Sequence, residues 1–117
     1  MKKVLVVDDN VVNRKLAVAL LKRRSMLVDE ADGGGVALEM LKAGSFEAVL
    51  LDISMPVMDG NEVCRIIRAT PALATLRVVA YTAHAMESER ESIMAAGFDD
   101  LLVKPISAQD LLRALPD

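Results

Sequence analysis

The sequence has little of what a disulfide-bonded, membrane-spanning or nucleic-acid-binding protein needs. Cys64 is the single cysteine among 117 residues, so no internal disulfide can form and a reducing, cytoplasmic setting is expected. No apolar run approaches the roughly 20 residues of a membrane-spanning helix, and the run after residues 1–3 is too short for the core of a signal peptide. The net charge of −3 offers no basic surface for nucleic acid or for an anionic membrane.

The composition is that of a chain able to build one core. Apolar residues make up 53% of the sequence and charged residues 26%, which disfavours disorder. The length suits one domain, and no repeat, linker or low-complexity segment interrupts it. We therefore expect a single domain over residues 1–117.

Short apolar runs alternate with amphipathic segments along the chain. The expected strands are residues 3–7, 26–30, 47–51, 77–81 and 100–103. The expected helices are one of about 14 residues after the first strand, one opening at Gly33–Gly35, one that follows Asp59-Gly60 and stops at Thr70-Pro71, one from about residue 85 to 96, and a short one capped by Ser107. This alternation predicts an α/β fold, a doubly wound parallel sheet with five strands and five flanking helices.

Polar side chains stand at the ends of four of these strands. Asp8 and Asp9 follow the first strand and Asp52 the third, while Thr82 and Lys104 follow the fourth and fifth. In a parallel sheet the carboxyl ends of the strands lie at one edge, so these side chains should converge. Three crowded carboxylates repel one another unless a cation joins them, and their oxygens suit a hard ion such as Mg²⁺. The edge has the make-up of a phosphoryl-transfer site.

A simpler explanation exists for each carboxylate by itself. A single aspartate after a strand is more often a helix cap or a turn residue than a metal ligand, and Asn10 or Asp9 could cap the first helix. Coincidence does not readily explain three such carboxylates together with Thr82 and Lys104 at matching positions. The sequence therefore favours a functional cluster.

Four segments of the sequence resemble the receiver domain of bacterial two-component response regulators. They are Val6-Val7-Asp8-Asp9-Asn10, the run LDISMPVMDG at 51–60, Tyr81-Thr82-Ala83, and the run AGFDD at 96–100 that leads into Val103-Lys104-Pro105. The resemblance covers nearly the whole chain, and within the family the chain resembles the chemotaxis regulators. It implies the flavodoxin-like strand order 2-1-3-4-5.

The resemblance also implies a role for each polar residue at this edge. Asp52 would be the nucleophile that accepts a phosphoryl group from a phosphohistidine. The implied Mg²⁺ ligands are Asp8, Asp9, Asp52 and the backbone carbonyl of Ser54. The implied contacts to the phosphoryl oxygens come from Thr82, Ala83 and Lys104.

The function implied is that of a signalling module that catalyses only its own phosphorylation and slow dephosphorylation. Its expected partners are a histidine kinase or phosphotransfer protein and a downstream protein on the fourth helix, fifth strand and fifth helix, with no nucleic acid or membrane partner. One alternative is an aspartyl phosphatase, but Ser54 stands where those enzymes typically carry a second acid. Another is an interaction domain that is never phosphorylated. A stand-alone regulator and a receiver within a larger or hybrid protein both remain open.

Three further residues carry specific expectations. The sharp turn after the fifth strand predicts a cis peptide bond before Pro105, where cis costs only ~0.5–1 kcal/mol. Leu101 stands where receivers often carry an aromatic switch residue, so it is either a half-exposed strand residue or a sign that signalling proceeds without that ring. His84 is expected at a solvated helix start, with a weaker hypothesis that it and Ser54 tune the access of water.

Overall fold

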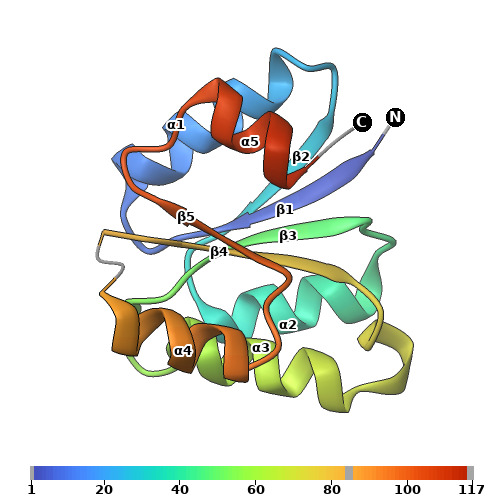
Figure 1. The fold of residues 1–117 in the computed structure, drawn as a ribbon. Helices are drawn as coiled ribbons and strands as arrows, with labels where there is room; N and C mark the ends of the chain where they lie inside the picture. The colour runs from blue at the N-terminus through green and yellow to red at the C-terminus, as the bar shows by residue number, and fades with distance from the viewer. Residues whose placement is uncertain (1, 84–85, 116–117) are drawn as a thin grey trace.

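The apolar runs of the sequence form one parallel sheet that lies between two layers of helices (Figure 1). This computed structural model describes residues 2–83 and 86–115. The five strands in these residues are β1 (Lys3–Val7), β2 (Leu27–Ala31), β3 (Ala48–Asp52), β4 (Arg77–Thr82) and β5 (Asp100–Val103). The five α-helices in the same residues are α1 (Val11–Lys22), α2 (Gly34–Ala43), α3 (Gly60–Ala69), α4 (Glu87–Ala95) and α5 (Ala108–Ala114), and a short 3-10 helix, η1 (Pro71–Leu73), precedes β4. No helix within the described residues is long and apolar enough to cross a membrane.

The strands follow the order β2-β1-β3-β4-β5, and every neighbouring pair is parallel. The predicted doubly wound α/β fold with order 2-1-3-4-5 is therefore confirmed. β2 lies at one edge of the sheet, and it carries Asp29 and Glu30, whose charges disfavour pairing with a further strand. The register places Val7 beside Leu51 and Asp52 beside Tyr81, so the carboxyl ends of β1, β3 and β4 lie level.

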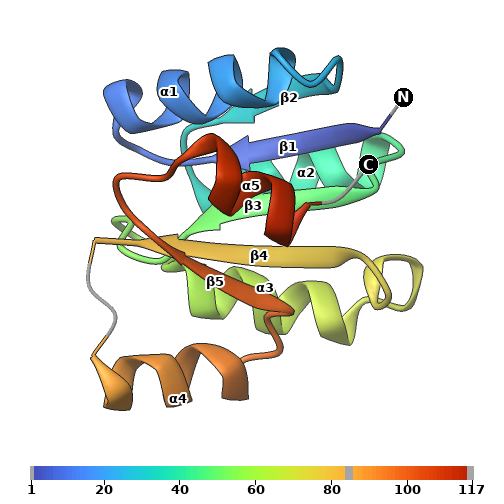
Figure 2. The same cartoon turned by 45° about the horizontal axis from the view of Figure 1, so that its top comes forward.

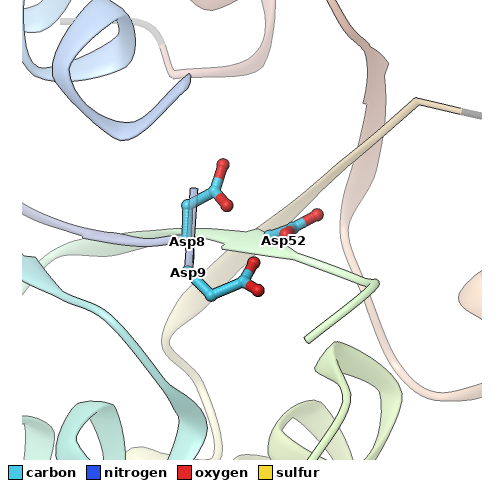
Figure 3. Close-up of side chains that lie close together, drawn as sticks. All are labelled: Asp8, Asp9 and Asp52. Carbon is cyan, nitrogen blue, oxygen red and sulfur yellow. The ribbon is translucent and has the colours of Figure 1, made fainter. Parts of the chain in front are cut away.

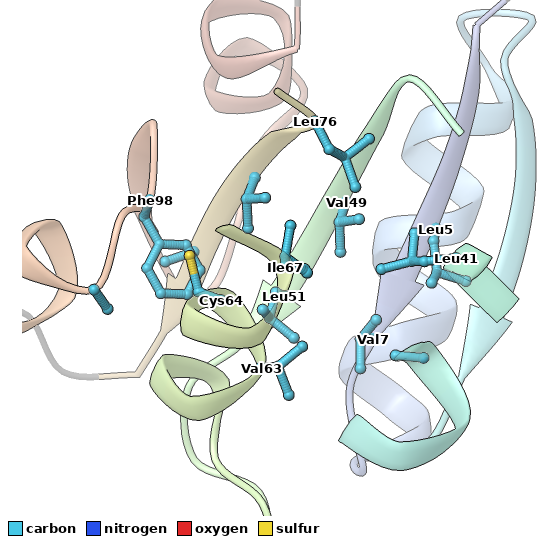
Figure 4. Close-up of a cluster of buried hydrophobic side chains, with 14 of the residues drawn as sticks. Leu5, Val7, Leu41, Val49, Leu51, Val63, Cys64, Ile67, Leu76 and Phe98 are labelled. Atoms are coloured by element: carbon cyan, nitrogen blue, oxygen red, sulfur yellow. The ribbon is translucent and has the colours of Figure 1, made fainter. Parts of the chain in front are cut away.

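Helices cover both faces of the sheet (Figure 2). On one face α2, α3 and α4 pack against strand residues that include Leu5, Val49 and Leu51 (Figure 4). On the other face α1 and α5 pack against a cluster that includes Val6 and Leu50. Successive residues of a strand point to opposite faces, so a strand covered on both sides must be apolar at successive positions. This explains why the apolar runs are uninterrupted until the polar residues at their ends.

Side-chain caps fix where three of the helices begin. Asn10 accepts a hydrogen bond from a backbone amide in the first turn of α1, and Asp59 caps α3 in the same way. Ser107 and Asp110 form a reciprocal capping box at the start of α5. Because Asn10 is the cap of α1, the alternative in which Asp9 has that role is excluded.

Several boundaries differ by one or two residues from the predicted ones. β2 and β3 begin and end one residue later than predicted, and β4 extends to Thr82. α1 has 12 residues rather than about 14, because the chain turns at residues 23–25 and Ser25 adopts a left-handed conformation with φ of 61°. The predicted start of the fourth helix, near residue 85, lies outside the described residues.

The end of β5 settles two of the local expectations. The peptide bond between Lys104 and Pro105 is cis, as predicted. The interpretation of Leu101 as a half-exposed strand residue is wrong, since only 8% of it is exposed. Leu101 belongs to the core cluster beneath α4, with Ile93 and Phe98, because α4 covers that face of the edge strand.

Candidate functional site

The carboxyl ends of β1 and β3 bring three aspartates together, as the sequence predicted. Asp8 and Asp9 follow β1, and Asp52 is the last residue of β3 (Figure 3). An oxygen from each carboxyl group lies within 4.8 Å of the others. Asp8 and Asp52 are buried, at 0% and 3% exposed, whereas Asp9 is open to solvent. The cluster thus concentrates negative charge at two buried residues and one that faces water.

Lys104 reaches the same cluster from the end of β5. Its Nζ lies 3.1 Å from Oδ1 of Asp52 and 3.2 Å from Oδ2 of Asp8. This ammonium offsets one of the three negative charges and leaves an excess of carboxylate. A small divalent cation with oxygen ligands is the species that such a donor set suits.

Hydrogen bonds keep Asp8 ionised in spite of its burial. Burial alone would raise the pKa of this carboxyl group, but hydrogen bonds from the Tyr81 hydroxyl and the Asn10 amide hold the pKa below its usual value. The Asn10 amide donates to Oδ1 at 2.9 Å and Tyr81 donates to Oδ2 at 2.7 Å. Asp8 is therefore a fixed negative charge at neutral pH.

Asp52 has the opposite electrostatic balance. Burial raises the pKa of Asp52 to about 6, and the charge of Asp8 adds to this rise, while the hydrogen bond from Lys104 lowers it only in part. Its carboxylate is consequently the less favourable of the two buried charges. A cation entering the cluster would stabilise this carboxylate in its ionised form.

The loop after β3 folds tightly against the backbone of Asp52. A Cβ on Gly60 would lie 2.3 Å from the Asp52 carbonyl oxygen, so only glycine allows this approach. The amide of Gly60 donates to the carbonyl of Ile53 at 2.9 Å, which closes the loop at the start of α3. Ser54 is an exposed residue of this loop, two positions after Asp52. A role for its carbonyl as a ligand stays a prediction.

Thr82 and Ala83 complete the edge at the end of β4. Thr82 is buried, and its carbonyl accepts a 2.8 Å hydrogen bond from the backbone amide of Lys104, which ties the ends of β4 and β5 together. Ala83 follows it and is exposed. The remaining residue expected near the opening, His84, lies outside the described residues.

Sequence reasoning missed Tyr81, which lies at the centre of this network. Its side chain is fully buried, its hydroxyl contacts Asp8, and Nζ of Lys104 lies 4.6 Å from the centroid of its ring. Burial and the adjacent carboxylate raise the pKa of the Tyr81 hydroxyl far above its usual value. A buried tyrosine needs a hydrogen-bond partner, and its place directly before Thr82 was the available signal.

Known proteins resemble this chain in sequence. It matches the profile of the response regulator receiver domain over residues 4–116. It is 42% identical over 112 residues to the signal transduction histidine-protein kinase BarA of Escherichia coli K12, which covers 96% of this chain and 12% of that protein. It is 37% identical over 110 residues to the transcriptional regulatory protein ResD of Bacillus subtilis, which covers 94% of this chain and 45% of that protein. The chain thus spans less than half the length of either relative.

Solved structures resemble it in fold. The chemotaxis protein CheY4 of Vibrio cholerae superposes with a TM-score of 0.92 at 29% identity, covering 98% of this chain and 96% of that one. The receiver domain of sensor histidine kinase PA1611 from Pseudomonas aeruginosa gives a TM-score of 0.89 at 32% identity, covering 96% and 92%. That receiver holds a magnesium ion in its active-site cleft.

Proposed function

This chain belongs to the response regulator receiver domain family, and we propose that it accepts a phosphoryl group on Asp52 in a Mg²⁺-dependent reaction. One observation carries the proposal. Asp52 is buried at the end of β3, within 4.8 Å of two further carboxylates and 3.1 Å from the ammonium of Lys104. A carboxylate nucleophile, a cation site and a fixed positive charge are the parts that phosphoryl transfer requires.

The donor set of the cluster fits Mg²⁺. The residues proposed to hold the ion are Asp8, Asp9, Asp52 and the backbone carbonyl of Ser54. All of these donors are oxygens, and the excess negative charge of the cluster favours a divalent cation. When bound, Mg²⁺ would offset the repulsion between the acidic cluster and an incoming phosphoryl group. The magnesium ion in the related PA1611 receiver supports this proposal.

The chain's own residues would then carry out the transfer. An oxygen of Asp52 attacks the phosphorus of a phosphohistidine, a new oxygen–phosphorus bond forms, and the phosphorus–nitrogen bond to histidine breaks. Lys104 pairs with one phosphoryl oxygen, and Thr82 and Ala83 contact the others. Ser54 supplies no carboxylic acid to activate water, so hydrolysis of the aspartyl phosphate is slow. The domain therefore acts on itself and does not turn over a separate substrate.

The phosphoryl donor we propose is a histidine kinase or a phosphotransfer protein. The named roles of BarA and ResD, a histidine kinase and a transcriptional regulator, support a place in such a relay. Exposed apolar side chains occur in the segments that follow Asp9 and Asp52 in the chain, and they support a protein donor; they are Val11 and Val12 at the start of α1 and Val57 in the loop after β3. The buried, unpaired Cys64 fits the reducing cytoplasm in which we place the domain.

A downstream protein is proposed to read the surface formed by α4, β5 and α5. Figure 2 shows β5 at the edge of the sheet with α5 on one side and α4 on the other. Large apolar side chains are exposed on or beside these three elements, and these are Met86, Met94, Val103 and Leu112. Phosphorylation adds charge at the neighbouring strand ends and would bias this surface between two states.

The proposal is tested by intact-mass measurement after incubation with Mg²⁺ and a phosphorylated phosphotransfer protein. The wild-type chain should gain one phosphoryl group, and Asp52→Asn should gain none. Asp59→Asn is the matched control, because asparagine also caps a helix and this variant should be labelled normally. Labelling of Asp52→Asn at the wild-type rate would contradict the assignment. Many turnovers per chain would indicate a phosphatase. A failure of wild type and both variants to gain a phosphoryl group would indicate an interaction domain that is never phosphorylated.

A further inference from the structure

Tyr81 makes a contact with the acidic cluster that the proposed function does not use. Its side chain is fully buried, and its hydroxyl donates a 2.7 Å hydrogen bond to Oδ2 of Asp8. We infer that Tyr81 is a positioning residue that orients Asp8 for Mg²⁺ through this hydrogen bond. The inference rests on the proposed function, because it concerns how one of the proposed Mg²⁺ ligands is held.

The surroundings of Tyr81 fix the direction of its hydroxyl. The ring belongs to the core cluster beneath α1 and α5, which also contains Leu102 and Ile106. On another side, Nζ of Lys104 lies 4.6 Å from the ring centroid. A ring packed in this way has little freedom to rotate about χ1. Its hydroxyl is therefore directed at Asp8 by the packing of the core.

Lys104 contacts the same oxygen of Asp8 but has a second task. Its Nζ lies 3.2 Å from Oδ2 of Asp8 and 3.1 Å from Oδ1 of Asp52, and the proposed function has it pair with a phosphoryl oxygen. The hydroxyl of Tyr81 keeps its place when Lys104 turns to that oxygen, because the ring is held by the core. The Asn10 amide donates to Oδ1 of Asp8 at 2.9 Å, and the Tyr81 hydroxyl donates to Oδ2. Together these two donors hold both oxygens of the carboxylate.

This restraint has a consequence for the metal. Mg²⁺ demands nearly ideal octahedral geometry, so its affinity depends on the orientation of each carboxylate. Groups that hydrogen-bond to a metal ligand typically change metal affinity by 10–100-fold when removed. Loss of the Tyr81 hydroxyl alone should therefore weaken Mg²⁺ binding about 10-fold.

Tyr81→Phe tests the inference, because it removes the hydroxyl and keeps the ring. Mg²⁺ affinity is measured from the rise in melting temperature across a Mg²⁺ titration, with circular dichroism to show that each variant is folded. Ile106→Val is the matched control, since it loosens the same core cluster and leaves the hydroxyl in place. We expect Tyr81→Phe to need about 10 times more Mg²⁺ than wild type, and Ile106→Val to need the same amount.

Tyrosine emission gives a second readout that a purely structural role would not move. Tyr81 is the single tyrosine and the chain has no tryptophan, so the emission belongs to this side chain. A phenol that donates to a carboxylate emits weakly. Mg²⁺ would draw negative charge from the Asp8 carboxylate while the hydrogen bond stays in place, so it should brighten the emission with the same midpoint as the melting titration. Asp8→Asn should brighten the emission without Mg²⁺ and abolish the response.

The outcomes separate this inference from the function on which it rests. If folded Tyr81→Phe binds Mg²⁺ as tightly as wild type, the positioning role is overturned and the metal site stands. If wild type shows no response to Mg²⁺ in either readout, the metal site and the inference both fall. If Tyr81→Phe does not fold, the wild-type emission decides. A change that tracks Mg²⁺ supports the role, and constant emission during a rise in melting temperature overturns it.

Discussion

At the amino edge of the sheet, the guanidinium of Arg68 donates to three backbone carbonyls, those of Ala74, Leu76 and Gly97, and to the carboxylate of Asp99. At the carboxyl edge, Lys104 faces the carboxylates of Asp8 and Asp52 with Asp9 beside them, and the charges do not balance. The first arrangement pairs partly buried polar groups of the chain with one another. The second leaves a negative excess that protonation of Asp52 or an added cation can offset.

The two edges therefore contribute to stability with opposite signs. Asp99 stabilises the folded state, since its Oδ2 accepts hydrogen bonds from Arg68 and from the amide of Val78, both at 2.8 Å. Ionised Asp52 destabilises the folded state, since burial beside Asp8 raises its pKa to about 6. Unbalanced charge that persists in a buried position indicates a function, because replacing it would otherwise stabilise the fold.

Removal of Arg68 should give the largest effect. Arg68→Met leaves three carbonyls and a carboxylate without their donor, so the free energy of unfolding should fall by about 2–4 kcal/mol. Urea denaturation measures this change. Arg113→Met is the control, because Arg113 lies 3.9 Å from Asp100 with 62% of its side chain exposed, and its loss should cost less than about 0.5 kcal/mol. Equal losses for the two variants would remove the distinction that we draw for the amino edge.

Replacing an aspartate by asparagine should change the free energy of unfolding in opposite directions at the two edges. Without metal at about pH 7.5, Asp52→Asn should raise the free energy of unfolding by about 1–3 kcal/mol. Asp99→Asn should lower it by about 1–2 kcal/mol, because the amide loses the charge that Arg68 pairs with. Urea denaturation in the presence of a chelator measures both changes.

The gain in Asp52→Asn should depend on pH. The folded-state pKa of Asp52 lies near 6, above its usual value of 3.8, so the folded chain binds more protons between these values and wild-type stability falls as pH rises through them. The free energy of unfolding of Asp52→Asn should thus exceed that of wild type very little at about pH 4, and by its full amount above about pH 7. An advantage of constant size across this range would show that charge is not its cause.

Mg²⁺ should stabilise the wild-type chain by a smaller amount. At 10 times the dissociation constant, binding to the folded state adds about 1.4 kcal/mol. Asp9→Ala should remove most of this gain and change the metal-free stability little, because Asp9 is exposed. Melting temperatures across a Mg²⁺ titration check the prediction. The same response in wild type and Asp9→Ala would exclude Asp9 as a ligand.

The smallest expected effect lies at Leu101. Beryllofluoride mimics the bound phosphoryl group and should shift the backbone resonances of Ser54 and Thr82 strongly. Leucine has no hydroxyl and less volume than an aromatic ring, so its contacts contribute less to the difference in free energy between the free and the beryllofluoride-bound states. The backbone resonances of Leu101 should therefore shift much less than those of Ser54 and Thr82. Two-dimensional NMR with and without the mimic measures this. Shifts at Leu101 as large as those at Thr82 would show that leucine serves as the switch.

The sequence was enough to predict the fold and most of the acidic edge. Apolar runs of three or four residues precede Asp8, Asp52 and Lys104, and each run indicates both a strand buried on both faces and a polar residue at its carboxyl end. Parallel pairing then brings those ends together, whichever helix lies between them. Proximity of the three aspartates followed from topology and was confirmed by the structure.

Other features depend on contacts that no local pattern encodes. The bond from Tyr81 to Asp8 joins residues 73 positions apart and needs the lateral order of three strands. The burial of Leu101 depends on α4 packing over the edge strand. Val57 adopts a left-handed φ of 71°, which sterics disfavour for a β-branched residue, so its conformation is imposed by closure of the loop between Asp52 and Gly60.

The most direct test of the central claim measures the stability of wild type and Asp52→Asn with and without Mg²⁺. The claim is that Asp52 destabilises the metal-free fold and is kept because a cation and a phosphoryl group use it. Without Mg²⁺ the asparagine variant should be the more stable of the two. With Mg²⁺ at 10 times the wild-type dissociation constant, wild type should gain about 1.4 kcal/mol and the variant much less, so the difference should shrink or reverse. A difference that Mg²⁺ leaves unchanged would contradict the account.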